Sequence, residues 1–100
     1  MELVRQDDEV VQMRGDLHIS EAEELRKALL GELVERTALT LDLSRVNGCD
    51  TAGFQLLCAL HKSAERDGKA LQIFSPSAAV REASATIGLS LEELTNVSQS

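Results

Sequence analysis

Apolar and polar residues alternate in several short stretches of the chain, and a period of two residues predicts β-strands. The clearest stretch is residues 37–44, where the leucines from Leu39 to Leu43 share one side and polar residues share the other. This pattern predicts a sheet with only one thoroughly apolar face. The predicted strands are residues 3–5, 9–14, 37–44 and 70–74.

Between and after these strands, apolar residues recur every three or four positions, which predicts amphipathic helices. Ser20 and Glu23 form a capping-box pattern, in which the Ser20 hydroxyl accepts a hydrogen bond from the Glu23 amide at a helix start. The predicted helices are residues 20–34, 51–66 and 75–88, with a short last helix from residue 90. Residues 95–100 are expected to form a disordered tail.

The predicted order is strand, strand, helix, strand, helix, strand, helix, helix. Parallel neighbouring strands need crossover connections, which are almost always right-handed when they pass through a helix. A chain of 100 residues also has the usual size of one domain. The sequence therefore predicts a single small α/β domain over residues 1–100, with a mixed sheet of four to five strands and about four helices.

The net charge of −7 narrows the classes of partner. Nucleic acids and anionic membranes are bound through basic patches, and no basic cluster is visible in the sequence, so neither is expected here. No apolar run approaches the roughly 20 residues of a membrane span, and the first residues do not resemble a signal peptide. Together with only two cysteines, Cys49 and Cys58, these features predict a cytoplasmic protein with reduced thiols.

The segment Gly48–Leu57 places Asp50 and Thr51 directly before the second predicted helix. A helix start offers free backbone N–H groups and the positive end of the helix dipole, so a hydroxyl there is a suitable phosphoacceptor. Gly53 would let a partner or a phosphoryl group come close to the backbone. The alternative is structural, with Asp50 or Thr51 acting only as a helix cap. Phe54 also has two interpretations, packing at the edge of the core or contact with a partner.

The residue combinations of common enzymes are not assembled in this sequence. His18 and His61 are isolated, and Cys49 stands beside an acidic residue, which raises the pKa of a thiol and makes it a poor nucleophile. Neither a Gly-rich phosphate loop nor a metal-ligand spacing occurs. We therefore expect no catalytic residues, no metal site and no cofactor.

Several segments taken together resemble the STAS domain family, the fold of bacterial anti-sigma-factor antagonists. No single segment is specific, but they follow in the family's order and spacing over most of the chain from Leu39 onward. The segments are LDLSRV at 41–46, CDTAGFQLL at 49–57, GKAL at 68–71, PSAAVR at 76–81 and IGL at 87–89.

The resemblance implies a non-enzymatic signalling protein that binds other proteins and regulates transcription. Typical partners in the family are anti-sigma factors that are also ATP-dependent serine/threonine kinases. The kinase phosphorylates the residue that follows the aspartate, which is Thr51 here, and phosphorylation releases the partner. The partner-binding residues implied by the resemblance are Asp50, Thr51, Ala52, Gly53 and Phe54.

Two positions depart from the commonest family pattern, because Thr51 stands where serine is usual and Phe54 where an aliphatic residue is usual. A threonine at this position is also similar to the small cytoplasmic STAS subunits of phospholipid-transporting ABC complexes, whose partner is an ATPase subunit. STAS adaptors encoded beside chemotaxis kinases are similar too. The candidate functions are therefore a phosphorylation switch, a transporter subunit and an adaptor, the last either chemotaxis-linked or never phosphorylated.

Overall fold

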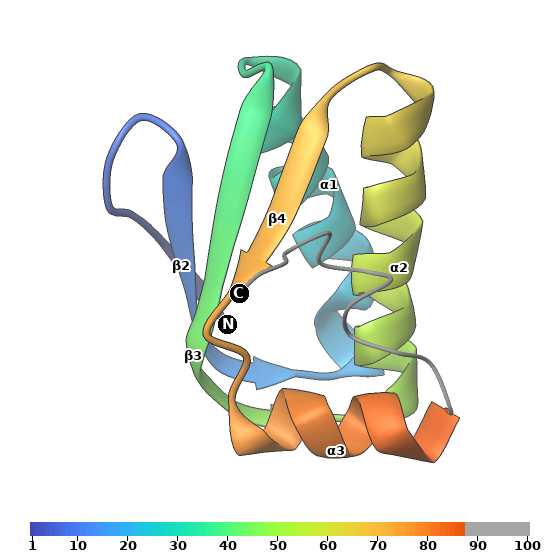
Figure 1. The fold of residues 1–100 in the computed structure, drawn as a ribbon. Helices are drawn as coiled ribbons and strands as arrows, with labels where there is room; N and C mark the ends of the chain where they lie inside the picture. Colours follow the sequence, from blue (N-terminus) through green and yellow to red (C-terminus); the bar gives the residue numbers. More distant parts are fainter. Residues whose placement is uncertain (88–100) are drawn as a thin grey trace.

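The computed structural model describes residues 1–87, and over this range it confirms the predicted order of strands and helices (Figure 1). The predicted helix from residue 90 and the predicted tail at 95–100 lie outside the described residues. The elements are β1 (Glu2–Arg5), β2 (Val10–Leu17), the 3-10 turn η1 (Ile19–Glu21), α1 (Ala22–Val34), β3 (Ala38–Cys49), α2 (Thr51–Arg66), β4 (Ala70–Phe74) and α3 (Ala78–Ile87).

The four strands form one mixed sheet in the order β1-β2-β3-β4. β1 is antiparallel to β2, whereas β2, β3 and β4 run parallel to one another. Each parallel pair is joined through a helix, α1 between β2 and β3 and α2 between β3 and β4. The predicted α/β class with a mixed sheet is confirmed, with four strands and three α-helices in residues 1–87.

One face of the sheet is buried beneath the helices. Leu39, Leu41 and Leu43 of β3 are almost fully buried, as their alternation predicts. They share a single core with Leu29 of α1 and Leu57 of α2, neither of which is exposed. Because burial of a leucine side chain stabilises a fold by about 1.5–3 kcal/mol, this core holds the helices on the sheet and positions the start of α2.

Both β2 and β3 extend beyond the ends that the sequence pattern predicts. β2 continues through Gly15 to Leu17, β3 continues to Cys49, and the two strands remain paired up to these last residues. Two register shifts in this region each place one extra residue on β3. An extra residue interrupts the period-two alternation, and this is why the pattern predicts shorter strands.

The start of α1 differs from the prediction. Residues Ile19–Glu21 form a 3-10 turn, closed by a hydrogen bond from Glu21 N to His18 O (3.1 Å), and Glu21 is the N-cap of α1. No side chain accepts a capping hydrogen bond at this N-cap. The predicted capping box between Ser20 and Glu23 is therefore wrong, because the 3-10 turn moves the helix start past Ser20.

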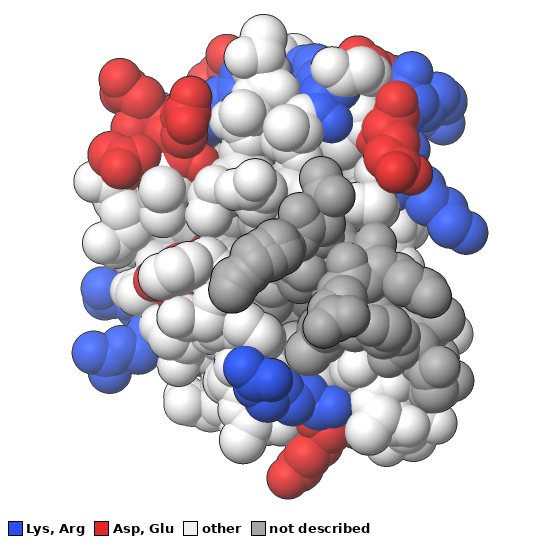
Figure 2. Space-filling view, viewed as in Figure 1, with Lys and Arg blue, Asp and Glu red and all other residues white. Residues whose placement is uncertain are grey.

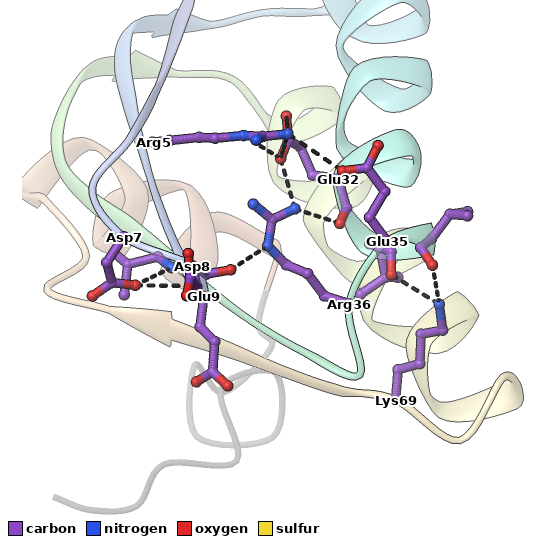
Figure 3. Close-up of polar contacts among 11 residues, drawn as sticks. Arg5, Asp7, Asp8, Glu9, Glu32, Glu35, Arg36 and Lys69 are labelled. Carbon is purple, nitrogen blue, oxygen red and sulfur yellow. Dashed lines mark hydrogen bonds and ion pairs between the residues drawn. The ribbon is translucent and has the colours of Figure 1, made fainter.

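A cluster of polar side chains links three loops, those after β1, after α1 and before β4 (Figure 3). The cluster lies at the end of the sheet that is remote from the start of α2. Arg36 donates to the Asp8 carbonyl (2.7 Å) and to the Glu32 carboxylate (2.7 Å), which also accepts from Arg5 of β1 (3.2 Å). Burial would raise the pKa of Glu32, but hydrogen bonds from these two arginines hold it below its usual range. Lys69 Nζ donates to two carbonyls in the last turn of α1 (2.8 and 3.1 Å). This end of the molecule is thus fastened by charge-assisted hydrogen bonds.

The outer face of the sheet, opposite the helices, carries polar side chains. The strand register places Gln12, Asp42 and Phe74 side by side on β2, β3 and β4. Gln12 Nε2 donates to Asp42 Oδ2 (3.0 Å), and Gln12 is nearly buried. Phe74 is 58% exposed, whereas Phe54, the other phenylalanine of the chain, is fully buried.

Candidate functional site

The Asp50 side chain caps α2. Its backbone is extended (φ −91°, ψ 175°), and its carboxylate accepts a hydrogen bond from Gly53 N at 2.6 Å. Its carbonyl accepts from Phe54 N at 3.0 Å, which closes the first turn of the helix. Of the two residues that the sequence offers as caps, the structure therefore uses Asp50.

Thr51 is the first residue of α2, and its side chain is exposed. Within residues 1–87 no hydrogen bond of its hydroxyl is found, and the N–H groups of Thr51 and Ala52 have no backbone or side-chain acceptor there. The expected exposure of this hydroxyl at a strand-to-helix junction is confirmed. Its phosphorylation stays a prediction.

Gly53 is required by packing within the chain. A Cβ atom at this position would lie 2.9 Å from the Leu17 carbonyl carbon and closer still to its oxygen. The Leu17 carbonyl also accepts a hydrogen bond from Asp50 N (3.2 Å), so the end of β2 is held against the first turn of α2. The prediction that Gly53 leaves space for a partner or a phosphoryl group is wrong, because Leu17 occupies that space.

Phe54 lies in the core and has no exposed surface. Packing is therefore the correct one of its two interpretations, and the expectation that its ring belongs to a partner-binding surface is wrong. Phe54 follows the exposed Thr51 by three residues, and at 3.6 residues per turn its side chain points to the buried side of α2. Of the five predicted partner-binding residues, Asp50, Thr51 and Ala52 retain exposed surface, whereas Gly53 and Phe54 are buried.

Two polar residues near this site were missed by the sequence analysis. An ideal Cβ at Gly48 would lie 3.2 Å from Asp16 Oδ1 and 3.4 Å from His18 Nε2, so both side chains lie over the backbone of β3 two residues before Asp50. The parallel pairing of Asp16 with Gly48 brings them there. The sequence pattern does not reveal these two residues, because it predicts that β2 ends before Gly15. Asp16 and Gly48 are aligned only because β2 continues beyond Gly15.

The pKa values of both thiols near this site are raised, which makes the thiols less reactive. Burial, and then the negative charge of Asp50, raise the pKa of Cys49 to about 11, so its thiol stays protonated at neutral pH. Burial also raises the pKa of Cys58. Both cysteines are free and partly buried. Among the described residues no group of three acidic, histidine or cysteine side chains could hold a metal ion, and no helix is long and apolar enough to cross a membrane.

The geometry of the strand-to-helix junction and the order of the elements agree with a known family. A family model described as "Mlab, STAS domain" matches residues 2–95. The chain belongs to this STAS domain family. No curated protein matches this STAS domain in sequence.

Solved structures share the fold of this STAS domain. A Thermotoga maritima protein assigned as an anti-sigma factor antagonist is 22% identical, with a TM-score of 0.72 over 94% of this chain and 81% of that chain. The anti-sigma factor antagonist SpoIIAA in its unphosphorylated form is 21% identical, with a TM-score of 0.68 over 88% of this chain and 80% of that chain. A variant of RsbS from Moorella thermoacetica is 21% identical, with a TM-score of 0.70 over 91% and 80%. At these identities the likeness shows the fold.

Proposed function

We propose that this STAS domain is a non-enzymatic protein-binding module whose affinity for a partner is switched by phosphorylation of Thr51. The observation that supports the proposal is that two adjacent residues at the start of α2 differ in role, since one caps the helix and the other has an exposed hydroxyl. Asp50 supplies the cap, so the exposed Thr51 hydroxyl is not needed to hold the helix. A side chain without a structural role at a helix N-terminus can accept a phosphate without unfolding the domain.

Phosphorylation would change both charge and geometry at this site. A phosphate carries a charge of about −1.5 to −2 at neutral pH and has three strong acceptor oxygens. It would compete with the Asp50 carboxylate for the N–H groups of the first turn and would repel that carboxylate. A partner surface that fits the unmodified junction would therefore bind the modified junction weakly.

The partner proposed for this site is a serine/threonine kinase of the anti-sigma-factor type, acting in the cytoplasm. The exposed part of the site consists of Asp50, Thr51 and Ala52, and we add Asp16 and His18 at its rim because they lie over Gly48. The similarity in fold to SpoIIAA, which is described in its unphosphorylated form, supports a family context in which phosphorylation matters.

A second candidate function is that of a constitutive STAS subunit in a lipid-transporting ABC complex, with an ATPase subunit as partner. Two observations favour it over a chemotaxis-linked adaptor. The matching family model carries the Mlab description, and a threonine stands at the acceptor position. In this case the junction would bind its partner without a phosphorylation cycle.

The experiment is a phosphorylation assay with the purified chain, the kinase encoded nearest to it and ATP, read by intact mass. We expect one added phosphate on the wild type and none on Thr51→Ala. Thr86→Ala is the matched control, since Thr86 is also an exposed threonine on a helix, and it should be labelled like the wild type. Equal labelling of Thr51→Ala, or none on the wild type, would refute the switch.

Capture from native lysate separates the two candidates. The wild type, Thr51→Glu and Thr51→Ala are used as baits, and the captured proteins are identified by mass spectrometry. Loss of a kinase from the Thr51→Glu bait supports the switch. An ATPase of a transporter, retained by wild type and lost with Thr51→Ala, supports the second candidate and excludes the first.

A further inference from the structure

The outer face of the sheet carries a pair of arginines in an unusual arrangement. Arg14 of β2 and Arg45 of β3 are direct partners in the parallel register, and both are exposed. Like charges directly opposite each other on neighbouring strands repel and destabilise a sheet. Figure 2 shows both acidic and basic side chains at the left edge of the molecule, the acidic ones above the basic ones, on the side where Figure 1 places β2.

Within residues 1–87, Arg14 and Arg45 lack the carboxylate contacts that four other arginines have, and Arg81 lacks them too. Ion pairs to carboxylates are formed by Arg5, Arg26, Arg36 and Arg66. Neither Arg14 nor Arg45 contacts a carboxylate in residues 1–87, although the chain has 17 acidic residues and 10 basic ones. Arg14 Nε donates instead to a neutral acceptor, Gln12 Oε1, at 2.6 Å.

The local backbone is shaped so that Arg45 reaches this face. A register shift lies between Gln12 and Arg14, and it places an extra residue on β3. Asp42 Oδ1 accepts a hydrogen bond from Ser44 N (2.9 Å), and both Ser44 and Arg45 are exposed. Burial would raise the pKa of Asp42, but hydrogen bonds from Ser44 and Gln12 and the charge of Arg45 hold it below its usual range. Bulges of this kind re-aim side chains, and they recur next to functional sites.

An apolar group lies on the same face as the two arginines. Phe74 of β4 pairs with Asp42 in register, and Asp42 pairs with Gln12. Phe74 is therefore two strands from Arg14 and one strand from Arg45, with its ring 58% exposed. We call Arg14, Arg45 and Phe74 the outer-face patch.

We propose that the outer-face patch binds an acidic segment of a partner protein, with carboxylates on the two arginines and an apolar side chain on Phe74. Charge complementarity identifies this occupant, because neither guanidinium group contacts a carboxylate in residues 1–87, and the nearby Asp42 carboxylate already accepts hydrogen bonds from Gln12 and Ser44. Two such adjacent guanidinium groups favour an anionic ligand that can accept bidentate hydrogen bonds. An exposed aromatic ring on the same face, on the far side of Asp42, is the usual anchor of a protein interface. This surface goes beyond the proposed function. Arg45 is four residues before Cys49 at the end of β3, which is about 13 Å along the strand at 3.3 Å per residue.

The test uses a fluorescein-labelled twelve-residue peptide of glutamates with two central leucines, titrated with the full chain by fluorescence anisotropy. Arg14→Gln/Arg45→Gln is compared with Arg26→Gln/Arg66→Gln, which changes the net charge equally but removes arginines that already have acidic neighbours. We expect at least tenfold weaker binding for the first variant and less than twofold for the second. Phe74→Ala should weaken binding several-fold, and the measured affinity of the wild type should fall with added salt.

Two further measurements show whether the variants fold and where the peptide binds. Circular dichroism verifies that the double variants fold, and ¹H–¹⁵N spectra with added peptide should show shifts confined to the outer face of β2, β3 and β4. Equal weakening by the two double variants would overturn the proposal, as would absence of peptide binding. So would binding of phosphatidylserine vesicles that exceeds peptide binding and depends on the same arginines, since the ligand would then be a membrane. Thr51→Ala should bind the peptide like the wild type, so failure here and failure of the phosphorylation switch are distinguishable.

Discussion

The Asp50 carboxylate accepts a hydrogen bond from Gly53 N at 2.6 Å, whereas the neighbouring Thr51 side chain is exposed. Asp50 and Thr51 are equally good caps by residue type, and the extended backbone of Asp50 decides which one caps. Gly53 shows the same dependence on surroundings, because the approach of the Leu17 carbonyl excludes any side chain there. At the residue scale, the site is therefore defined by backbone geometry.

Substitution at the helix start should separate the structural residue from the proposed functional one. Asp50→Ala removes the cap, and we expect it to lower the free energy of unfolding by about 0.5–2 kcal/mol. Thr51→Ala removes no hydrogen bond of residues 1–87, and we expect a change within about 0.5 kcal/mol. Urea unfolding followed by circular dichroism measures both. A larger loss for Thr51→Ala than for Asp50→Ala would contradict the assigned roles.

The glycines of the helices provide a second comparison. Gly53→Ala forces a methyl group into the Leu17 carbonyl, and overpacking of this kind lowers the free energy of unfolding by about 1–3 kcal/mol. Gly31→Ala is the matched control, since no atom lies within 4 Å of its Cβ position in α1. Alanine is the better helix former, so this variant should be more stable than the wild type by about 0.5–1 kcal/mol. Thermal unfolding of the two variants would show shifts of opposite sign, and equal shifts would contradict the packing assigned to Gly53.

The ends of the elements are held by side chains from distant parts of the chain. Arg36 and Arg5 both bind the Glu32 carboxylate, and Lys69 binds the carbonyls at the end of α1 (Figure 3). These contacts connect β1, α1 and the loop before β4. At the element scale, tertiary contacts therefore stabilise the C-terminal end of α1, whereas no side chain caps its start.

The hydrogen bonds to the Glu32 carboxylate predict how the free energy of unfolding changes with pH. Burial raises the pKa of Glu32, but the hydrogen bonds from Arg36 and Arg5 outweigh burial and the pKa is lowered. A lowered pKa in the folded state contributes stability that is present above the unfolded-state pKa of 4.5 and is lost as the pH falls through the folded-state value. Urea unfolding between pH 7 and pH 3 should therefore show a falling free energy, and Glu32→Gln should show a smaller fall. Glu24→Gln, an exposed change on the same helix, controls for the lost charge. An unchanged pH dependence in Glu32→Gln would contradict the assignment.

Within residues 1–87, one face of the sheet lies in the core beneath the helices, and the other face carries mostly polar side chains. The only two aromatic residues lie on opposite sides of this division, Phe54 fully buried and Phe74 58% exposed. The proposed switch lies at the start of α2, and the outer-face patch lies on the open face of the sheet. At this scale the two proposed surfaces are separate, and phosphorylation of Thr51 would change the first and leave the second intact.

The two aromatic residues allow a matched test of this arrangement. Phe54→Ala leaves a cavity in the core, and we expect it to lower the free energy of unfolding by about 3–5 kcal/mol, a large part of the total stability of a small domain. Phe74→Ala should change it by less than about 0.5 kcal/mol. Differential scanning calorimetry measures both. A small effect of Phe54→Ala would contradict its place in the core.

Sequence pattern alone determined the class of the fold, the order of its elements and the junction that holds Thr51. These are local properties, because alternation in Leu39–Leu43 and the helical spacing of apolar residues depend only on near neighbours. Tertiary structure alone decided that β2 reaches Leu17, that Gly53 and Phe54 are buried, and that Arg14 meets Arg45. Each of these depends on which strands pair and in what register. Side chains tens of residues apart decide register, and no local pattern contains that information.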